Sequence, residues 1–533
     1  MSCQLNIAPE VSKQWNTGWK AHTGFAIRNP LLCRRGDCDD AGVLFSAARI
    51  YSGVRGSVFN SYSSCNTSFT CLRHTCTPTS IFNASSEDTH GCFGSGRKTR
   101  FYCTGSVDSV DTQKAVEFVS ASAFGLDCAR ADVLIVGAGI VGLSIAHRLL
   151  STTDLSVALV DAAEPCAGAT GAGQGYVWLG HRNPETVAWN LAKRSKYLWD
   201  KLALGLQASG LDPLKAFGFK KTGSLLFSSS LQDAVALEER ADALHKGGVH
   251  VDFLNATSLK DVEPQLHLGS EGSAILTHDD CQIDAKLAVS YLLKEIKEHC
   301  SSGRFQQLFH EPAVSFLWDN QIRGIQTNRR KVYCKKLIVA AGGWSGQLMQ
   351  NIFDRLSLSY VLPTKPRKGH LLVFEGLPQF SLEHGLMEYS YKKLEESSDP
   401  FGIASTATMD AEGRLLLGSS RQFVGFDYTV QFDVMEKILL KATEYLPALA
   451  KLHLTEALKT GSARVGHRPY VPDGRPMIGE VEGLEGLLLA TGHEGEGLSL
   501  SLGTAEMIVD MLLGEKEPVV DPSPFLPAGR LVL

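Results

Sequence analysis

The sequence predicts an α/β fold built on a parallel sheet, and three observations support this prediction. Apolar runs at 133–136, 337–341 and 487–490 each lead into a glycine-rich turn. Helical patterns follow the first run, at 140–150, and the last run, towards residue 513. Buried parallel strands are continuously apolar because helices cover the faces of their sheet.

The first turn carries the most specific motif. Gly137, Gly139 and Gly142 have the G-x-G-x-x-G spacing between a strand and a helix. The first glycine allows a tight turn, the second lets a pyrophosphate approach the backbone, and the third lets the helix pack on the strand. Backbone N–H groups at Ile140 and Val141 begin that helix, whose positive end attracts phosphate. The motif predicts a Rossmann-like, dinucleotide-binding segment.

A second apolar run, 157–160, ends at Asp161 and Ala162. A carboxylate here accepts hydrogen bonds from a ribose 2′-OH, which favours FAD or NAD over NADP. The loop 169–175 (ATGAGQG) consists of small residues that can press against a ring or a phosphate, although a flexible turn has the same composition. A helix is expected at 184–207. The predicted contacts in the loop are Thr170, Gly171, Gln174 and Gly175.

The three glycine turns are far apart in the sequence, so a ligand that meets all of them is long. FAD fits this requirement better than NAD because it lies extended across such a sheet.

Size and composition are those of an ordinary globular protein of two or three domains. The net charge of −5 gives no reason to expect nucleic acid as a partner. No apolar run reaches the ~20 residues of a spanning helix, so no transmembrane segment is predicted. The cysteines form no C-x-x-C pair, and no metal site is predicted.

Residues 1–130 are rich in Ser, carry scattered Arg and contain no acidic residue between 41 and 86. This composition is typical of an organelle transit peptide, and we expect a plastid (chloroplast) location, with the mitochondrion as the alternative. A disordered low-complexity extension or a misassigned gene start would have a similar composition. The few cysteines beyond residue 130 favour a reducing compartment.

Six segments, in order along the chain, carry a family resemblance. They are VGAGIVG (136–142), ATGAGQG (169–175), VAAGGWS (339–345), PRKGHLLV (366–373), VGHRPYVPDGRPMIG (465–479) and TGHEGEGL (491–498). Residues 131–516 therefore resemble the D-amino-acid-oxidase-type (DAO) FAD-dependent oxidoreductases. This family includes glycine oxidase, sarcosine oxidase, D-amino acid dehydrogenase, and subunits of opine oxidase and hydrogen cyanide synthase. The details are most similar to a plant, plastid-type branch.

The resemblance implies a Rossmann-like FAD-binding domain interleaved with an α+β substrate domain built on a mixed sheet. The expected FAD-binding domain comprises 131–208, 271–350 and 463–516, and the expected substrate domain comprises 209–270 and 351–462. Residues 1–130 are expected to be transit peptide and disordered spacer, and 517–533 a C-terminal tail.

The resemblance also implies further contacts with FAD. The backbone of Val314 would meet the adenine, and Gly342 and Trp344 would line the cofactor. The flavin pyrimidine end would face the backbone of Gly495, Gly497 and Leu498.

Family members transfer a hydride from the carbon that bears the amine to flavin N5, and the imine then hydrolyses. Such a reaction needs an anchor for the substrate carboxylate, and the planar fork of Arg is suited to it. Arg468 stands where glycine and D-amino acid oxidases place this arginine. The alternative for Arg468 is a structural salt bridge with Asp473 or another acid.

Three further side chains are candidates for the catalytic site. The hydroxyl of Tyr389 or Tyr391 would close the carboxylate site, unless both are half-buried strand tyrosines. His493 lies in a glycine turn and would donate a hydrogen bond near the flavin, or serve the structure alone.

Other positions separate this chain from its relatives. Gly495 stands where glycine oxidase has a further arginine, so substrate contacts there must differ. Sarcosine oxidases of the family carry a cysteine that links the flavin in this later part of the chain. No cysteine follows Cys334 here, so the resemblance implies non-covalent FAD. Arg367, Lys368 and His370 either face the substrate mouth or form a solvated rim.

The predicted function is an FAD-dependent oxidoreductase that oxidises a small amine or amino acid. Glycine, D-amino acids and secondary amines all remain open as substrates, oxygen or a quinone as acceptor, and a homo-oligomer as the assembly. The alternative is an organelle flavoprotein that acts as an assembly or stabilising factor with little turnover. The dispersed glycine turns disfavour a third possibility, an NAD-dependent dehydrogenase.

Overall fold

The computed structural model describes residues 127–300, 303–377, 380–389, 401–452, 454 and 462–532. All of them belong to one compact unit. Most of the expected 1–130 segment, and Tyr391, lie outside these residues. None of the helices in the described part of the chain is both long and apolar enough to cross a bilayer.

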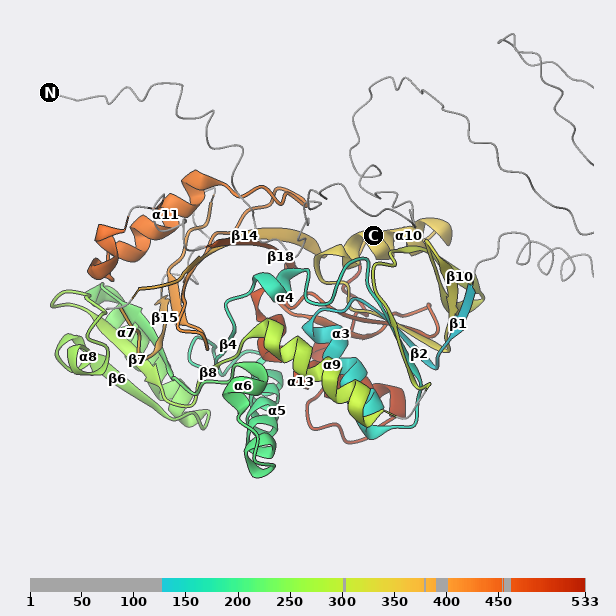
Figure 1. The fold of residues 1–533 in the computed structure, drawn as a ribbon, viewed down its shortest axis with the longest axis horizontal. Helices are drawn as coiled ribbons and strands as arrows, with labels where there is room; N and C mark the ends of the chain where they lie inside the picture. Colours follow the sequence, from blue (N-terminus) through green and yellow to red (C-terminus); the bar gives the residue numbers. More distant parts are fainter. Residues whose placement is uncertain are drawn as a thin grey trace, which may run out of the picture. The chain divides into compact units, whose positions relative to one another are not determined.

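The glycine turns belong to one largely parallel sheet (Figure 1), in which the strand order is β19-β20-β13-β2-β3-β9. β20, β13, β2, β3 and β9 run parallel, and β19 is antiparallel at one edge. The prediction of a parallel sheet is confirmed. The bounds are β2 Val133–Val136, β3 Val157–Val160, β9 Phe305–Leu308, β13 Lys336–Val339, β19 Met477–Glu480 and β20 Leu487–Thr491.

Residues along each strand alternate between the two faces of this sheet, so each face has a core of its own. Helices cover one of these faces. Val133 and Ile135 of β2 pack into a core formed with these helices. The predicted helix at 184–207 begins later than expected, at Trp189, since turns occupy 184–188. The helices are α3 Ile140–Thr152, α5 Trp189–Ala208, α6 Pro213–Phe217, α9 Ala285–His299 and α13 Gly497–Leu513.

The other face packs against a small sheet and a helix. Leu134 and Val136 of β2 join this second core, together with Ile325 and Phe353. The strand order of the small sheet is β1-β12-β11-β10. These elements are β1 Asp127–Arg130, β10 Ala313–Asp319, β11 Gln321–Thr327, β12 Arg330–Tyr333 and α10 Ser345–Arg355.

The large mixed sheet has the strand order β18-β14-β17-β16-β15-β5-β7-β6. Its strands are β5 Ser224–Ser228, β6 Val251–Asn255, β7 Ser273–Thr277, β14 Lys365–Phe374, β15 Gly385–Glu388, β16 Thr406–Met409, β17 Leu415–Gly418 and β18 Ser462–Tyr470. The remaining elements are α4 Ala169–Ala172, β4 Tyr176–Val177, α7 Leu231–Lys246, α8 Ala256–Val262, β8 Cys281–Gln282, α11 Phe432–Thr443, η2 Gly342–Trp344, η4 Pro447–Lys451, η5 Glu494–Glu496 and η6 Ser523–Phe525.

The two faces of β14 and β18 meet different partners. Leu372, Phe374 and Ala463 pack with residues of α11 into one core. Alternation along each strand then places Gly369 and Gly466, which are register partners, on the opposite face. α4 lies on that opposite face, since the Cβ of Ala172 contacts Gly466. In Figure 1, α11 and α4 accordingly lie on opposite sides of β14 and β18.

The sheets differ from the expected segment boundaries in two places. β7 lies in the expected FAD-binding range, yet it pairs antiparallel with β5 and β6 in the mixed sheet. β18 also belongs to the mixed sheet, through β14. Every residue of β7 is buried, and this pattern fits a strand of either sheet. The sequence therefore did not show which sheet β7 joins. The division into two domains stays a prediction.

The segment expected as a C-terminal tail packs against the fold. The Phe525 side chain is fully buried in the helical core. Val532 pairs with Val361 through two backbone hydrogen bonds, and Arg530 forms an ion pair with Asp473.

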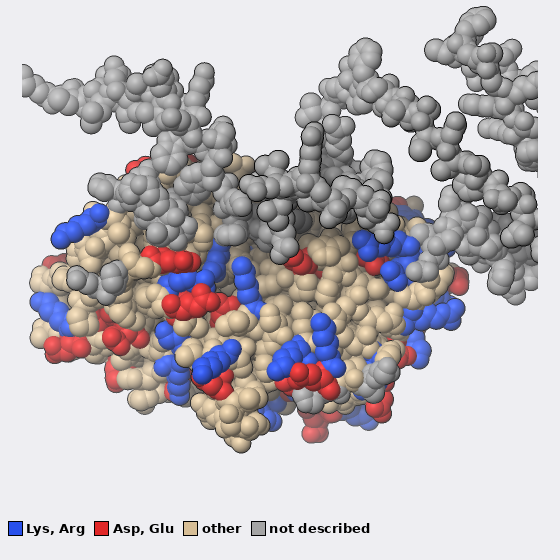
Figure 2. Space-filling model, in the orientation of Figure 1, with Lys and Arg blue, Asp and Glu red and all other residues tan. Residues whose placement is uncertain are grey.

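Charge is distributed evenly over the face shown in Figure 2. Lys and Arg side chains are interspersed with Asp and Glu among uncharged surface. The part of this face that is not drawn in grey presents no extended region of a single sign.

Candidate functional site

The carboxyl ends of three parallel strands bring the glycine turns to one edge of the sheet. β2 leads into Gly137, β13 leads towards η2, and β20 leads towards η5. The Thr491 hydroxyl donates to the Gly342 carbonyl at 3.2 Å and ties two of these strand ends together. Ligands of open α/β sheets bind at this edge.

The G-x-G-x-x-G residues have the geometry that the motif predicts. Gly137 has a φ of +116°, and a Cβ there would lie 2.3 Å from the Ala340 carbonyl oxygen. A Cβ on Gly142 would lie 2.0 Å from the Gly137 carbonyl oxygen. Gly139 and Val141 are half-exposed at the start of α3, whereas Ile140 is buried. Gly139, the N-cap, supplies no side-chain cap to this helix.

Asp161 holds the glycine turn. One carboxylate oxygen accepts from the Ala138 N–H at 2.6 Å, and the other accepts from the Ala163 N–H at 2.8 Å. Burial raises the pKa of Asp161, while these two N–H groups oppose that shift. Its neighbour Ala162 is exposed. The carboxylate therefore supports the backbone that would face a pyrophosphate, and its expected contact with a ribose stays a prediction.

The 169–175 loop forms α4 and lies against β18. None of the α4 residues is buried. Thr170 accepts from the Ile140 N–H at 3.2 Å, which joins this loop to the start of α3. A Cβ on Gly171 would lie 2.3 Å from the Cys166 carbonyl oxygen, and one on Gly175 would lie 2.2 Å from that of Ile283.

Gln174 is directed into the mixed sheet. Its amide nitrogen donates to the Leu416 carbonyl at 3.1 Å, and its amide oxygen accepts from the Thr406 hydroxyl at 2.7 Å. The side chain thus fixes the loop to β16 and β17. The backbone carbonyl of Gln174 accepts from the Gln282 amide at 3.0 Å, which leaves the backbone N–H for the predicted cofactor contact.

Val314 and Trp344 belong to two other elements, β10 and η2. The register of β10 with β11 passes from Ala313 to Ser315, so Val314 lies at an irregularity with its side chain exposed. Trp344 is half-exposed and stacks on Phe426, with ring centroids 4.8 Å apart. The contacts of both residues with FAD stay predictions.

The turn after β20 is half-exposed from residue 494 to residue 498. Gly495 and Gly497 lie here, and α13 begins at Gly497 without a side-chain cap. The Leu498 carbonyl accepts the indole N–H of Trp199 at 3.2 Å, which holds the backbone of the turn. A long helix that begins in such a turn favours negative charge in front of it.

Arg468 lies on the face of β18 that covers the loop. The guanidinium donates to the Ser420 carbonyl at 2.9 Å. Asp473 pairs with Arg475 and Arg530, so the alternative of an Arg468–Asp473 salt bridge is wrong. No ion pair among the described residues includes Arg468.

The other predicted catalytic residues that the structure describes, His493 and Tyr389, each contact a protein side chain. His493 is buried, and its Nε2 lies 2.9 Å from the Thr504 hydroxyl of α13. Burial lowers the pKa of His493 to about 4, so the ring is neutral at neutral pH. Tyr389 is half-buried against an apolar cluster, and Arg240 lies over its ring at 5.7 Å. These contacts favour structural roles for His493 and Tyr389.

The basic residues of β14 do not form a solvated rim, because Arg367, Lys368 and His370 are all buried. Lys368 donates to the carboxylate of Asp427 at 2.6 Å. Burial lowers the pKa of His370 to about 4, and its Nδ1 lies 2.9 Å from the Ser420 hydroxyl. Arg367 Nε donates to the Glu494 carboxylate at 2.6 Å.

Several residues around Gly495 were not predicted from the sequence. Glu496, which follows Gly495, is bound by Arg182 at 2.8 Å and by His181 at 3.2 Å. Burial would raise the pKa of Glu496, but Arg182 and His181 outweigh it and hold the pKa at about 2. Tyr176, directly after the ATGAGQG loop, directs its hydroxyl towards Gly495. Its position beside the loop was the one available signal.

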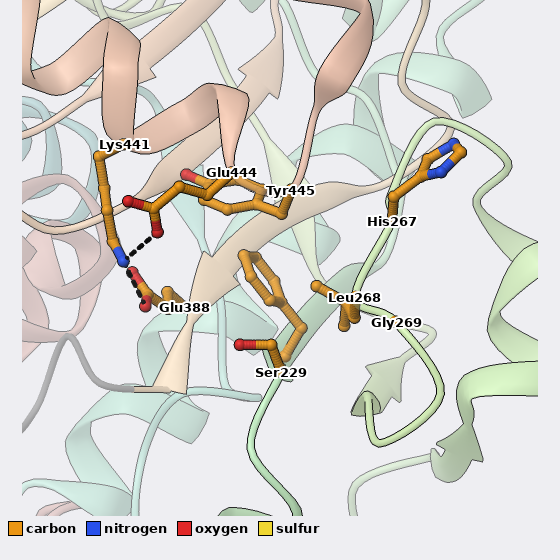
Figure 3. A pocket seen from close by; sticks show the side chains of 9 residues that line it. Ser229, His267, Leu268, Gly269, Glu388, Lys441, Glu444 and Tyr445 are labelled. Atoms are coloured by element: carbon orange, nitrogen blue, oxygen red, sulfur yellow. Dashed lines mark hydrogen bonds and ion pairs between the residues drawn. The ribbon is translucent and has the colours of Figure 1, made fainter.

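A separate pocket of about 280 Å³ lies beside α11 (Figure 3). Lys441 lies there between two carboxylates, 3.3 Å from Glu388 and 2.6 Å from Glu444. Burial would lower the pKa of Lys441, but these carboxylates raise it. Its cation is already neutralised, so this pocket offers no anchor comparable to Arg468. The described residues contain no cluster of His, Cys, Asp or Glu that could hold a metal.

The edge of the parallel sheet fits an extended dinucleotide. Gly137 and Gly142 admit no side chain, and the uncapped start of α3 has a half-exposed backbone at Gly139. The 169–175 loop and the turn after β20 continue this small-residue surface. Backbone N–H groups at such a helix start bind phosphate. The residues predicted from the sequence would therefore hold FAD.

Comparisons with known proteins agree with this geometry. The family model "FAD dependent oxidoreductase" (DAO) matches residues 132–511. Glycine oxidase of Pseudomonas aeruginosa is 29% identical over 412 residues, which cover 75% of this chain and 99% of that enzyme. The hydrogen cyanide synthase subunit HcnC of Pseudomonas protegens is 25% identical, over 74% of this chain and 95% of HcnC.

Solved structures show the same fold. Glycine oxidase from Geobacillus kaustophilus superposes with a TM-score of 0.63 at 22% identity. L-proline dehydrogenase from P. horikoshii has a TM-score of 0.63 at 20% identity. Each likeness covers 75% of this chain and 98% of the other. This chain belongs to the DAO family of FAD-dependent oxidoreductases.

Proposed function

We propose that this enzyme oxidises a small amine that carries a carboxylate: glycine, a D-amino acid or a secondary amino acid. The observation that carries the proposal is the position of Arg468. Its guanidinium lies on the β18 face that covers the 169–175 loop, and it donates a hydrogen bond to a neutral carbonyl, that of Ser420. It remains available to form two parallel bonds with a carboxylate.

The neighbouring charges support an anion at this place. Arg367 neutralises Glu494, and Arg182 neutralises Glu496. Arg468 is thus left as a cation beside paired groups. Glycine oxidase, the similar enzyme from Pseudomonas aeruginosa, acts on a substrate with one carboxylate and one amine.

Each part of the site has a separate task. FAD, when bound, would accept the hydride removed in an amine oxidation, which carries both electrons. Arg468 would orient the substrate through its carboxylate, and orientation lowers the barrier because it is settled before the reaction. The half-exposed turn around Gly495 would face the reacting end. The acceptor for the electrons, oxygen or a quinone, and a homo-oligomeric assembly are open parts of this proposal.

Anaerobic mixing of the purified holoenzyme with candidate substrates tests the proposal. Glycine, sarcosine, D-alanine, D-proline and an opine would each be followed by bleaching of the flavin absorbance. Bleaching by one of them in the wild type, with a loss of at least about tenfold in rate at low substrate for Arg468→Ala, is the expected result. A flavin that stays oxidised with the whole panel would instead favour a structural or assembly role.

We also propose that residues 1–130 direct the enzyme to a plastid, on the strength of their composition. Fusion of these residues to a fluorescent protein, with import into isolated chloroplasts and mitochondria, distinguishes the two organelles. A fusion that enters neither would contradict the targeting role.

A further inference from the structure

Two functional groups from distant parts of the chain face the same space over Gly495. A Cβ on Gly495 would lie 3.6 Å from Cδ and Nε of Arg468, and 3.8 Å from the hydroxyl of Tyr176. Arg468 comes from β18, Tyr176 from β4, and Gly495 from the turn after β20. Because residue 495 has no side chain, both groups border one volume at the predicted flavin end of the site.

The Tyr176 ring is held firmly in this position. The backbone carbonyl of Tyr176 accepts a hydrogen bond from the Ser499 hydroxyl of α13 at 3.1 Å. The ring packs on Trp178, with centroids 4.9 Å apart, and meets the edge of His181 at 5.8 Å. Trp178 is buried, and His181 is fixed by Glu496. These contacts already fix the side chain, so a ligand that binds the hydroxyl would lose little free energy in ordering it.

Arg468 is held with comparable precision. The guanidinium lies over Gly369 of β14, where a Cβ would be 2.6 Å from Nη1. Its bond to the Ser420 carbonyl fixes one end. The pair thus combines a positioned cation with a positioned hydroxyl donor, which is the donor set that a carboxylate prefers.

We propose that the Tyr176 hydroxyl donates a hydrogen bond to the substrate carboxylate that Arg468 anchors, which makes Tyr176 a specificity-determining residue. This inference rests on the proposed function. It assigns to Tyr176, which follows the 169–175 loop, the hydroxyl that was expected from Tyr389 or Tyr391. Gly495 has a matching role, since its missing side chain leaves the volume in which the carboxylate lies.

Binding of a non-oxidisable carboxylate tests the inference without any reaction. Acetate would be titrated into the holoenzyme, and ethylamine, which lacks the carboxylate, would be titrated in parallel. The flavin absorbance spectrum reports both. For Tyr176→Phe we expect the acetate Kd to rise by at least about tenfold, the scale of one lost hydrogen bond to a charged group. The ethylamine Kd should stay unchanged.

Two further variants complete the experiment. Tyr291→Phe removes a hydroxyl from a half-buried tyrosine of α9 that packs on Phe217, and it should bind acetate like the wild type. Gly495→Ala adds one methyl group that meets no protein atom closer than 3.6 Å. It should retain FAD and the fold and still lose acetate binding by at least about tenfold, because the methyl group enters the carboxylate volume.

The outcomes separate this inference from the proposed function. Unchanged acetate binding in Tyr176→Phe, with a large loss in Arg468→Ala, would overturn the role of Tyr176 and leave the anchor in place. Unchanged binding in Arg468→Ala would overturn the anchor itself. An equal loss of acetate and ethylamine binding in Tyr176→Phe would show a general packing effect and also overturn the inference.

Discussion

The guanidinium of Arg468 occupies the space that a side chain on Gly369 would fill. A Cβ there would lie 2.6 to 2.8 Å from Nη1, Cζ and Nη2 of Arg468. These residues come from adjacent strands, because Gly369 pairs with Gly466 and Arg367 pairs with Arg468 in the β14–β18 register. The glycine on β14 therefore determines where the arginine on β18 can lie.

Gly369→Ala should displace the guanidinium while the fold persists. The new methyl group meets the far end of a flexible side chain, which can move at little cost in stability. The substrate carboxylate then loses its aligned partner, and kcat/KM should fall by about tenfold or more. Steady-state kinetics and the thermal unfolding temperature check this together. A large fall in Tm with unchanged kinetics would contradict the argument.

The second and third glycines of the motif, Gly139 and Gly142, should separate cofactor binding from folding. A Cβ on Gly142 would meet the Gly137 backbone at 2.0 Å, so Gly142→Ala should destabilise the fold by a few kcal/mol. A Cβ on Gly139 would meet only the Thr170 hydroxyl, at 3.2 Å. Gly139→Ala should therefore fold and bind FAD less tightly, because a methyl group keeps the pyrophosphate from the backbone.

The measurements are flavin content after purification and the Tm of each apoprotein. Gly139→Ala with full flavin content would remove Gly139 from the phosphate site. Gly142→Ala with the wild-type apoprotein Tm would contradict the packing argument.

The parallel sheet could be predicted because its signals are local. β2 and β20 are continuous buried runs, and each leads towards a glycine turn. This combination of strand and turn is specific to few folds. The mixed sheet offered weaker signals. β7 is buried along its whole length, like a parallel strand, so its sequence did not show which sheet it joins. That choice depends on its antiparallel pairing with β5 and β6, which is a long-range property.

The site was predictable where the family motif gives a position, and less so where packing decides. Alternation along β18 places Arg468 on the same face as Gly466, towards the loop, and its role as the carboxylate anchor stays a prediction. His493 and Tyr389 looked equally suitable in the sequence, yet Thr504 and Arg240 contact them. Tyr176 was missed because its neighbours, Trp178 and His181, give no sequence sign that they orient its ring.

The ion pair between Arg367 and Glu494 should show strong coupling. The Arg367 side chain is 6% exposed and that of Glu494 is 21% exposed. Arg367→Met would leave the carboxylate without its partner and should cost about 3 kcal/mol of stability, whereas the double variant with Glu494→Gln should lose less. A double-mutant cycle of thermal or urea unfolding measures the coupling. Losses that simply add would show that the pair is not a unit.

A buried neutral histidine should make stability depend on pH between 4 and 6.5. Burial lowers the pKa of His493 from 6.5 to about 4, and the nearby Glu496 opposes this shift only in part. Below pH 6.5 the unfolded chain binds a proton that the folded chain does not, so the unfolded state gains as pH falls. The contribution is fully present above pH 6.5 and is lost as the pH falls to about 4, a change of about 3 kcal/mol.

His493→Gln removes the titrating ring and can retain a hydrogen bond to Thr504. Its Tm should therefore fall less steeply than that of the wild type between pH 6.5 and pH 4. Some dependence on pH should remain, because burial lowers the pKa of His370 and of His467 as well. His245→Gln, at an exposed position near the end of α7, serves as the control and should follow the wild-type curve. Identical slopes for His493→Gln and the wild type would show that His493 does not stay neutral in the fold, since a ring that binds its proton equally in both states contributes no dependence on pH.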